Sequence, residues 1–450
     1  MKKIALFFTV FLSLLMISCS GEKKLISTVE HPEWIKNAVI YEVNTRQFSV
    51  DGKFTSVEKE LPRLKSLGVD VLWFMPITPI GVEARKGSLG SYYSVKDYKA
   101  VNPEFGTIDD FKSLVAKAHE LGMKVIIDWV ANHTSRDAAW INNKEWYVMD
   151  STGTNPVAPF DWTDVAKLNY DNKEMRSAMK EAMIFWIKEA NIDGFRCDVA
   201  EHVPVDFWED AFSEIKKVKN DVFMLAEAEN PELQKNAFNA YYAWHLHHIM
   251  NNIAQGKATA DTLRKYFTES VKRFPSNTIP FNFTSNHDEN SWKGSEHERM
   301  GEYAKQMAVF TYVAPGIPLI YNGQEAGFNR RLLFFEKDSI DWKRDTSYTK
   351  LYQELYKLRK ENPVLNAPDN YNFEEINTDK PSSVYVMQRK SGSNSVISIF
   401  NFSTDTLTIK VEKGLEAGTY NSFMDTTTVQ LTNSGEFKLL PRDYKIYFKK

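Results

Sequence analysis

Short, almost wholly apolar segments recur along this chain, separated by amphipathic or turn-rich stretches. Residues 69–76 and 124–130 are the clearest of them. Strands that are apolar on both sides are typical of a parallel sheet that is covered on both faces. Six further segments fit the description, the one at 241–250 least well: 38–43, 195–199, 222–226, 241–250, 280–284 and 318–321. Eight such strands alternating with helices predict an α/β fold, the (β/α)8 or TIM barrel.

The stretch between the two clearest strands has the pattern of a helix. Residues 107–110 (TIDD) form a predicted N-terminal cap, and Gly122 marks the end. Apolar residues follow the cap at the spacing of one helix face: Phe111, Leu114, Val115, Ala118 and Leu121. A second helix is predicted over 175–190, before a turn at 191–194. These helices support the alternation that a barrel requires.

Two regions do not follow the alternation. Residues 131–168 are too long for an ordinary loop, so we expect a small inserted subdomain over the mouth of the barrel. After about residue 366, short alternating segments predict a C-terminal antiparallel β-domain, with strands at 383–388, 396–402, 407–411, 429–431 and 445–448. The predicted catalytic barrel is therefore 34–365, and the β-domain is 366–450.

The first residues have the pattern of an export signal. A basic start precedes an apolar run at 4–17, which is too short for a good membrane span. Residues 16–19 (MISC) resemble a bacterial lipobox, so we expect 1–18 to be removed, Cys19 to carry lipid and 19–33 to be a tether. The protein would then be exported and anchored to a bacterial membrane, at the outer membrane or cell surface. The alternative is an ordinary signal peptide with an incidental cysteine.

Composition excludes several classes of protein. A formal net charge of −3 gives no basic field for nucleic acid. Two cysteines exclude a disulfide framework and a cysteine-based zinc site. No glycine-rich loop for phosphate is present. Aromatic residues make up 13% of the chain, which fits a large core and also offers flat surfaces for sugars.

Three acids follow predicted barrel strands, where such barrels place their active sites. Asp198, Glu227 and Asp288 come at the ends of the fourth, fifth and seventh strands, so they should converge on one mouth. Retaining glycoside hydrolysis uses a pair of carboxyl groups, one as nucleophile and one as acid. Arg196 lies two residues before Asp198, on the same side of the strand, where its charge would keep Asp198 ionised.

At these strand ends the sequence resembles the α-amylase family, also called glycoside hydrolase family 13. The motifs are at 128–133 (DWVANH), 194–202 (GFRCDVAEH), 225–227 (LAE) and 283–288 (FTSNHD). Further matches lie at 39–42, 68–76, 93–98 and 316–325, and the resemblance runs from about Trp34 to the C-terminus. It implies a retaining glycosidase acting on starch-like α-glucans or maltooligosaccharides at α-1,4 bonds, through a covalent glycosyl-enzyme.

The resemblance also implies a role for each matching residue. Asp198 would be the nucleophile, Glu227 the acid/base, and Asp288 a third acid that binds sugar hydroxyls. Tyr93 would stack on the sugar being cleaved, although Tyr92 replaces the glycine usual before it. His133 and His287 would bind hydroxyls of that sugar, and Arg196 would lie beside the nucleophile as a charged contact to the site. Asp128 and Asn132 would support the site structurally.

Two departures from the family pattern bear on binding. Asn132 matches a calcium ligand of many members, but Lys167 stands where another ligand, an aspartate, is expected. We therefore expect no cofactor, with the usual calcium absent or weak. Glu201 replaces a lysine that contacts sugar on the leaving-group side, so binding there should differ.

Several alternatives remain open. The same motifs serve exo-acting α-glucosidases, oligo-1,6-glucosidases and transglycosylases, and a non-catalytic surface glycan-binding protein is a further hypothesis. His245, His247 and His248 could form a metal cluster, although histidines on a helix surface are the commoner explanation. Cys197, Trp73 and Trp129 are expected in the core.

Overall fold

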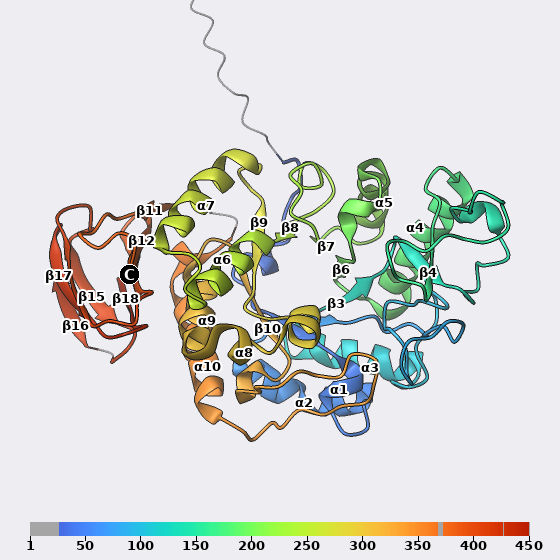
Figure 1. Ribbon diagram of the computed structural model, residues 1–450, viewed down its shortest axis with the longest axis horizontal. Coiled ribbons are helices and arrows are strands. Elements are labelled where there is room, and N and C mark those ends of the chain that lie inside the picture. Colours follow the sequence, from blue (N-terminus) through green and yellow to red (C-terminus); the bar gives the residue numbers. More distant parts are fainter. Residues whose placement is uncertain (1–26, 368–371, 426, 450) are drawn as a thin grey trace, which may run out of the picture.

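A closed parallel barrel forms the centre of the protein, as the apolar segments predict. The computed structural model describes residues 27–367, 372–425 and 427–449 (Figure 1). The barrel strands follow one another in chain order around the closed sheet, each parallel to its neighbours: β1 (Ile40–Val43), β2 (Val71–Phe74), β3 (Lys124–Trp129), β6 (Gly194–Cys197), β7 (Phe223–Ala226), β8 (Ala240–Tyr242), β9 (Ile279–Asn282) and β10 (Ile317–Tyr321).

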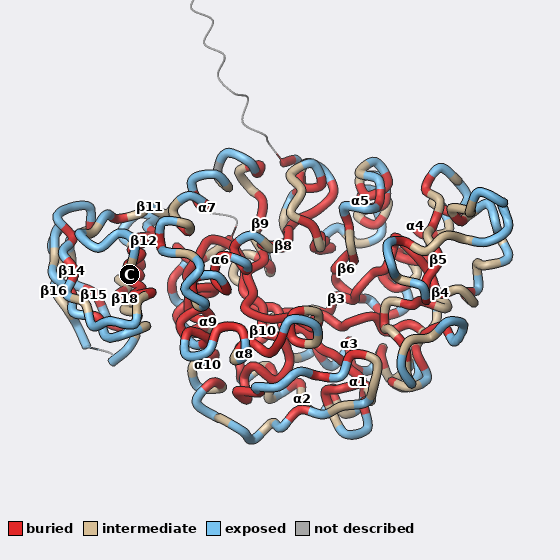
Figure 2. The backbone as a smooth tube through the Cα atoms, viewed as in Figure 1, coloured by how far each residue is buried: buried red, intermediate tan, exposed pale blue. Residues whose placement is uncertain are grey.

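Helices surround the barrel, whose strands are buried (Figure 2). Apolar residues of the helices and of the strands belong to one core cluster. The main ones are α2 (Phe54–Leu67), α3 (Ile108–Glu120), α4 (Lys173–Ala190), α5 (Val205–Val218), α6 (Trp244–Ala254), α7 (Ala260–Arg273), α9 (Ala304–Val313) and α10 (Thr346–Glu361). The predicted cap of α3 is confirmed, because Thr107 and Asp110 form a reciprocal capping box.

The strand predicted at 241–250 is wrong over most of its length. Only 240–242 form a strand, and α6 begins at Trp244. The buried residues Leu246, Ile249, Met250 and Ile253 lie three to four positions apart, which is the spacing of a helix face. The apolar residues of this region therefore face the core from a helix.

Large side chains fill the interior of the barrel. Trp73, Phe223, Phe281 and Tyr242 belong to one buried cluster formed by the inward faces of the strands. Cys197 and Trp129 are buried in the larger cluster between the barrel and its helices, which confirms the expectation that they are core residues. Because the interior is packed, a ligand can reach polar groups only at the strand ends.

At the amino-terminal end of the barrel, Asp193 is a fully buried carboxylate (0% exposed). It accepts hydrogen bonds from His119 (2.7 Å), Lys219 (2.9 Å) and the Val125 backbone N–H (2.9 Å). Burial alone would raise the pKa of Asp193, but these partners lower it to about 2. The ionised form is therefore the one that stabilises the fold.

We expect Asp193→Asn to lower the free energy of unfolding at pH 7 by about 2–3 kcal/mol, from the pKa shift. The folded pKa lies below the unfolded value of about 4, so the stabilisation is complete above pH 4 and is lost as the pH falls through about 2. Urea titrations at pH 7 and at low pH measure the difference. Asp150→Asn is the control, because Asp150 also has a pKa of about 2 but lies only partly buried, in a surface loop where solvent screens its hydrogen bonds. An equal loss in both variants would contradict the prediction.

The inserted subdomain and the C-terminal β-domain are both present. After β3, β4 (His133–Ser135) pairs antiparallel with β5 (Val165–Lys167). The C-terminal domain contains a sheet in the order β11 (Phe373–Glu375), β12 (Val384–Ser391), β13 (Asn394–Asn401), β18 (Tyr444–Lys449), β15 (Gly418–Ser422) and β16 (Thr428–Leu431), together with the pair β14 (Leu407–Val411) and β17 (Gly435–Leu439). The five predicted strands are confirmed, and β11, β15 and β17 are additional.

The chain enters the barrel at its amino-terminal face, opposite the predicted active site. His31 Nε2 lies 2.5 Å from the Asn277 carbonyl oxygen, two residues before β9. The Trp34 indole donates a hydrogen bond to the Asp221 carbonyl, two residues before β7. The predicted signal peptide and Cys19 lie outside the described residues. In the described part of the chain, no helix is long and apolar enough to cross a membrane.

Candidate active site

One buried guanidinium joins three of the predicted site acids. Arg196 comes from β6 and is 0% exposed. Its Nη1 donates hydrogen bonds to Asp128 Oδ1 (2.8 Å) and Asp198 Oδ1 (2.9 Å). Its Nη2 lies 2.8 Å from Glu227 Oε1, as an ion pair. The side chains from the ends of β3, β6 and β7 therefore meet at the mouth of the barrel, where the sequence places them.

A sharp turn after Asp198 positions Glu227. Val199 has a φ of +37°, in the left-handed region that a β-branched residue rarely adopts. In this conformation the Val199 backbone N–H donates a 2.8 Å hydrogen bond to Glu227 Oε2. Strain of this kind persists only where the surroundings enforce it. Glu227 is thus held from one side by Arg196 and from the other by the backbone.

Asp288 reaches the same site from the far side, after β9. His287 Nε2 lies 3.2 Å from Asp288 Oδ2 and 2.7 Å from the Tyr93 hydroxyl, which donates to Asp128 (2.9 Å). His287 Nδ1 lies 2.5 Å from Glu42 Oε1. The Asp288 side chain is 38% exposed, so it can meet a ligand. Glu42 lies in the stretch 39–42 that matches the family, but the sequence analysis gives it no role in the site. An acid within an apolar strand is a signal that could have indicated one.

Burial and charge divide the protons between Asp198 and Glu227. Burial raises the pKa of each carboxyl group to about 7, against the opposing charge of Arg196. The hydrogen bond from Arg196 favours ionised Asp198, and the Asp198 charge in turn raises the pKa of Glu227. The two carboxyl groups therefore titrate as a coupled pair near neutral pH, where one proton shared between them leaves one group ionised and the other protonated.

The two histidines of the site carry different charges. Burial lowers the pKa of His133 to about 3, so this ring is neutral. Burial would also lower the pKa of His287, but the charges of Asp288 and Glu42 raise it well above its usual value. The His287 charge in turn holds the pKa of Asp288 below its usual value, against the effect of burial. The site therefore presents an ionised third acid beside a cationic imidazole.

These groups line an open cleft of about 580 Å³. Its walls include Tyr93, His133, Asp198, Glu227 and Asp288, so every predicted contact to substrate except Arg196 and His287 faces it directly. Among the lining residues that the sequence motifs do not identify are Lys86, Trp292, Phe334 and Phe335. The volume and the mixture of aromatic and polar walls fit a short run of sugar rings.

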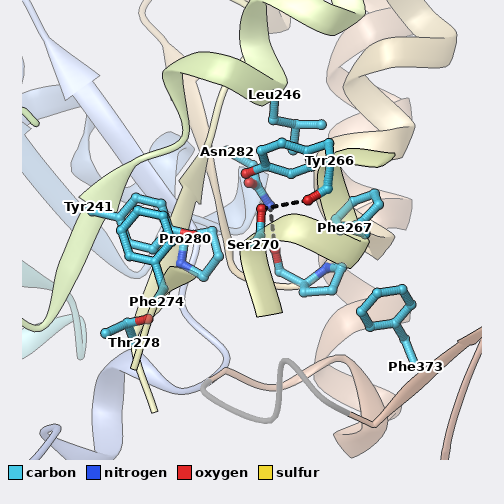
Figure 3. A pocket seen from close by; sticks show the side chains of 11 residues that line it. Tyr241, Leu246, Tyr266, Phe267, Ser270, Phe274, Thr278, Pro280, Asn282 and Phe373 are labelled. Carbon is cyan, nitrogen blue, oxygen red and sulfur yellow. Dashed lines mark hydrogen bonds between the residues drawn. The ribbon is translucent and has the colours of Figure 1, made fainter. Parts of the chain in front are cut away.

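A second, much smaller cavity lies outside the barrel, between β9 and α7 (Figure 3). It measures about 30 Å³, and Tyr241 stacks on Phe274 along its side with ring centroids 4.0 Å apart. Asn282 donates a hydrogen bond to the Pro315 carbonyl, and Ser270 donates to the Tyr266 carbonyl. This volume admits a water molecule but not a sugar.

At Asn132, the strand that pairs with the next residue carries Lys167 in place of the aspartate that the family pattern has there. The Asn132 amide nitrogen lies 3.1 Å from His133 Nδ1, and Lys167 is paired with His133 across the β4–β5 ladder. Over 27–367, 372–425 and 427–449, no group of three or more His, Cys, Asp or Glu side chains is arranged to hold a metal. His247 is buried, and its ring lies 3.0 Å from Glu289 Oε2 and 3.1 Å from the Phe283 carbonyl, which is a structural role.

Comparisons with known proteins agree with this geometry. Residues 42–163 and 158–344 match the model of the alpha-amylase catalytic domain. The α-amylase MalA of Haloarcula japonica is 27% identical over 86% of this chain, which spans 58% of that protein's length. Alpha-amylase 3 of Dictyoglomus thermophilum is 27% identical over 79% of this chain and 76% of its own.

Solved structures show the same architecture. An α-amylase from Lactobacillus plantarum superimposes with a TM-score of 0.83 at 29% identity, over 93% of this chain and 100% of that one. A maltogenic α-amylase, AmyB of Thermotoga neapolitana, gives 0.85 at 28% identity, over 92% and 99%. The matched catalytic domain contains Glu42 and all the acids that meet at Arg196.

Proposed function

Since this chain belongs to the α-amylase family of glycoside hydrolases, we propose that it hydrolyses α-1,4-glucosidic bonds in starch-like glucans or maltooligosaccharides with retention of configuration. The proposal rests on one observation: Asp198 and Glu227 form ion pairs with the two terminal nitrogens of Arg196. Carboxyl groups bound to one guanidinium lie close together, as a retaining mechanism requires. The α-amylases and maltogenic amylases among its relatives support the substrate class.

The geometry supports a double displacement. Ionised Asp198 attacks the anomeric carbon, and Glu227 gives its proton to the glycosidic oxygen as the bond to the leaving sugar breaks. Glu227, now ionised, then takes a proton from water, whose oxygen attacks the anomeric carbon and displaces Asp198. Asp288, Tyr93 and the two histidines hold the sugar, and Arg196 keeps the nucleophile ionised.

The proposal is tested by incubating residues 20–450 with soluble starch, maltooligosaccharides and isomaltose, with Asp198→Asn as the control. Cleavage of starch or maltooligosaccharides that disappears in the variant supports it. Cleavage of isomaltose alone would show that the enzyme acts on α-1,6 bonds and not on α-1,4 bonds. Binding of glucan without any cleavage would favour a non-catalytic glycan-binding protein. The intact network of acids around Arg196 argues against that alternative.

We propose further that the fold needs no calcium, because Lys167 stands in place of the expected aspartate ligand, on the strand paired with His133 next to Asn132. We expect the melting temperature to be unchanged in excess chelator. A tightly bound calcium would add several kcal/mol by mass action, so its removal would lower the melting temperature by several degrees. Differential scanning calorimetry with and without chelator measures this, and such a drop would refute the proposal. Lys167→Asp, which restores the expected ligand, shows whether Lys167 is the cause.

We also propose that lipid on Cys19 anchors the enzyme to a bacterial membrane. Residues 27–34 join the barrel at its amino-terminal face, so an anchored protein would turn its cleft away from the membrane. Labelling of cells with radioactive palmitate tests this. Label on the wild-type chain that is absent from Cys19→Ala supports the anchor, and an unlabelled membrane-free wild type would favour an ordinary signal peptide.

A further inference from the structure

The segment of residues 82–93, between β2 and α3, bridges one end of the cleft. On one side it is tied to the inserted subdomain. Lys86 Nζ lies 3.2 Å from Asp164 Oδ1, and both residues line the cleft. The Val82 backbone N–H donates to the carboxylate of Asp137 at 3.1–3.2 Å. The segment therefore cannot move away from the subdomain without breaking charged contacts.

On the other side, the same segment is tied to the loop that follows β10. The Leu89 N–H donates to the Phe335 carbonyl (3.1 Å), and the Ser88 N–H donates to Glu336 Oε1 (2.9 Å). The Ser88 hydroxyl also donates to Glu336. Gly87, at φ +63°, lies so close to Phe335 that a Cβ there would stand 2.4 Å from the Phe335 Cβ. The bridge thus continues from the subdomain to the β10 loop.

A buried arginine supports the bridge from below. Arg46 donates hydrogen bonds to the carbonyl oxygens of Gly90 (3.1 Å) and Leu89 (3.2 Å), and its guanidinium lies 4.2 Å from the centre of the Tyr92 ring. This also gives Tyr92 a packing role in place of the glycine usual in the family. The bridge is therefore held by hydrogen bonds or ion pairs to three parts of the protein: the inserted subdomain, the loop after β10 and Arg46.

Ring contacts connect the bridge to the side of the cleft where Asp288 lies. Tyr93, at the end of the bridge, stacks nearly parallel to Phe334, which packs on Trp292 beside Asp288. On the side of Glu227, the segment after Asp198 carries His202, whose ring lies 4.8 Å from that of Phe160. The leaving sugar departs past Glu227, so the glycone part of the substrate extends toward Tyr93 and the bridge.

We infer that this bridge closes the glycone end of the cleft and makes the enzyme act on the non-reducing ends of glucan chains, with release of a short product. The inference rests on the proposed function and specifies its mode of attack. An internal stretch of polymer needs a cleft open at both ends, whereas a terminal stretch fits one that is blocked. Lys86, 36% exposed, places an ammonium donor where hydroxyls of the terminal sugar would lie.

The test uses maltoheptaose carrying a chromophore at its reducing end, either free or blocked by an ethylidene group at its non-reducing end. We expect kcat/KM on the free substrate to exceed that on the blocked one by at least about tenfold, because the closed end rejects the added group. Equal values for the two substrates would overturn the inference and leave the proposed function intact. No cleavage of the free substrate would instead overturn the proposed function, and the inference with it.

A pair of variants tests the role of the bridge itself. Lys86→Ala combined with Glu336→Ala removes the side-chain ties at both sides of the cleft, and we expect the blocked-to-free ratio of kcat/KM to rise about fivefold. The control is Lys112→Ala, because Lys112 makes a comparable ion pair with Glu189 (3.5 Å, 42% exposed), which lies outside the cleft lining and does not contact the bridge. A ratio that stays at the wild-type value in the double variant, or rises equally in the control, overturns the assignment. Melting temperatures verify that all variants are folded.

Discussion

Glu227→Gln should hydrolyse maltooligosaccharides about 10²–10⁴-fold more slowly than the wild type, yet form the glycosyl-enzyme readily from α-maltosyl fluoride. Fluoride departs without a proton, so the first step no longer needs the acid. The second step still needs Glu227 as a base, so the covalent intermediate should accumulate. Intact-mass spectrometry detects the added maltosyl group, and mass spectrometry of a proteolytic digest should place it on the peptide that contains Asp198.

Asp198→Asn should behave differently, losing about 10⁴-fold or more with both kinds of substrate, because it lacks the nucleophile. Glu229→Gln is the matched control for the general acid, since its carboxylate accepts the His245 backbone N–H and does not line the cleft. It should keep its activity. If Glu227→Gln were equally slow on the fluoride and on maltooligosaccharides and formed no adduct, the assigned roles would be wrong.

The parts of the site that could be predicted are those that depend on strand ends. Asp198 and Glu227 follow apolar strands directly, Asp288 follows one after five residues, and a parallel barrel brings all such positions to one face. Asp128 is a similar case, because it lies next to the last residue of β3 and the structure joins it to Arg196. For these residues, periodicity and one fold-level rule are sufficient.

The parts that could not be predicted come from loops that meet only in the folded state. Lys86 and Glu336 lie 250 positions apart along the chain, and nothing in either local sequence indicates that both border one cleft. Trp292 and Phe334 are likewise brought together by tertiary packing. Glu42 differs, since an ionisable residue within the short strand β1 is itself an unusual pattern.

The prediction of secondary structure failed where polar residues concealed the periodic spacing of the buried ones. Strand β15 has the sequence GTYNS, in which glycine, asparagine and serine suggest a turn, yet Tyr420 and Ser422 are buried on one face of the sheet. In α6, three histidines and two asparagines dilute the helical spacing of the apolar residues. Both elements are specified by which side chains are buried, and that depends on neighbours distant in sequence.

Arg196→Gln should move the acid limb of the pH profile of kcat/KM to higher pH, by about one unit or more. Activity requires ionised Asp198, so the midpoint of this limb follows the pKa of that group. The Arg196 charge lowers the pKa of Asp198, so its removal leaves burial unopposed and raises that pKa further above about 7. Loss of this cation among buried acids should also destabilise the protein by about 3–5 kcal/mol.

Asp128→Asn should shift the same limb in the opposite direction. The Asp128 charge raises the pKa of Asp198, so the neutral amide lowers it and the limb moves to lower pH. Arg196→Lys keeps a positive charge but lacks the two terminal nitrogens that contact both carboxylates. The acid limb of its pH profile should therefore stay nearer to the wild-type position, although its rate should fall. Rates from pH 4 to 9 on one soluble maltooligosaccharide provide all three profiles. Because a general loss of stability would lower every rate without moving the limbs apart, opposite shifts in the two neutral variants would show that Arg196 and Asp128 act on the proton of Asp198.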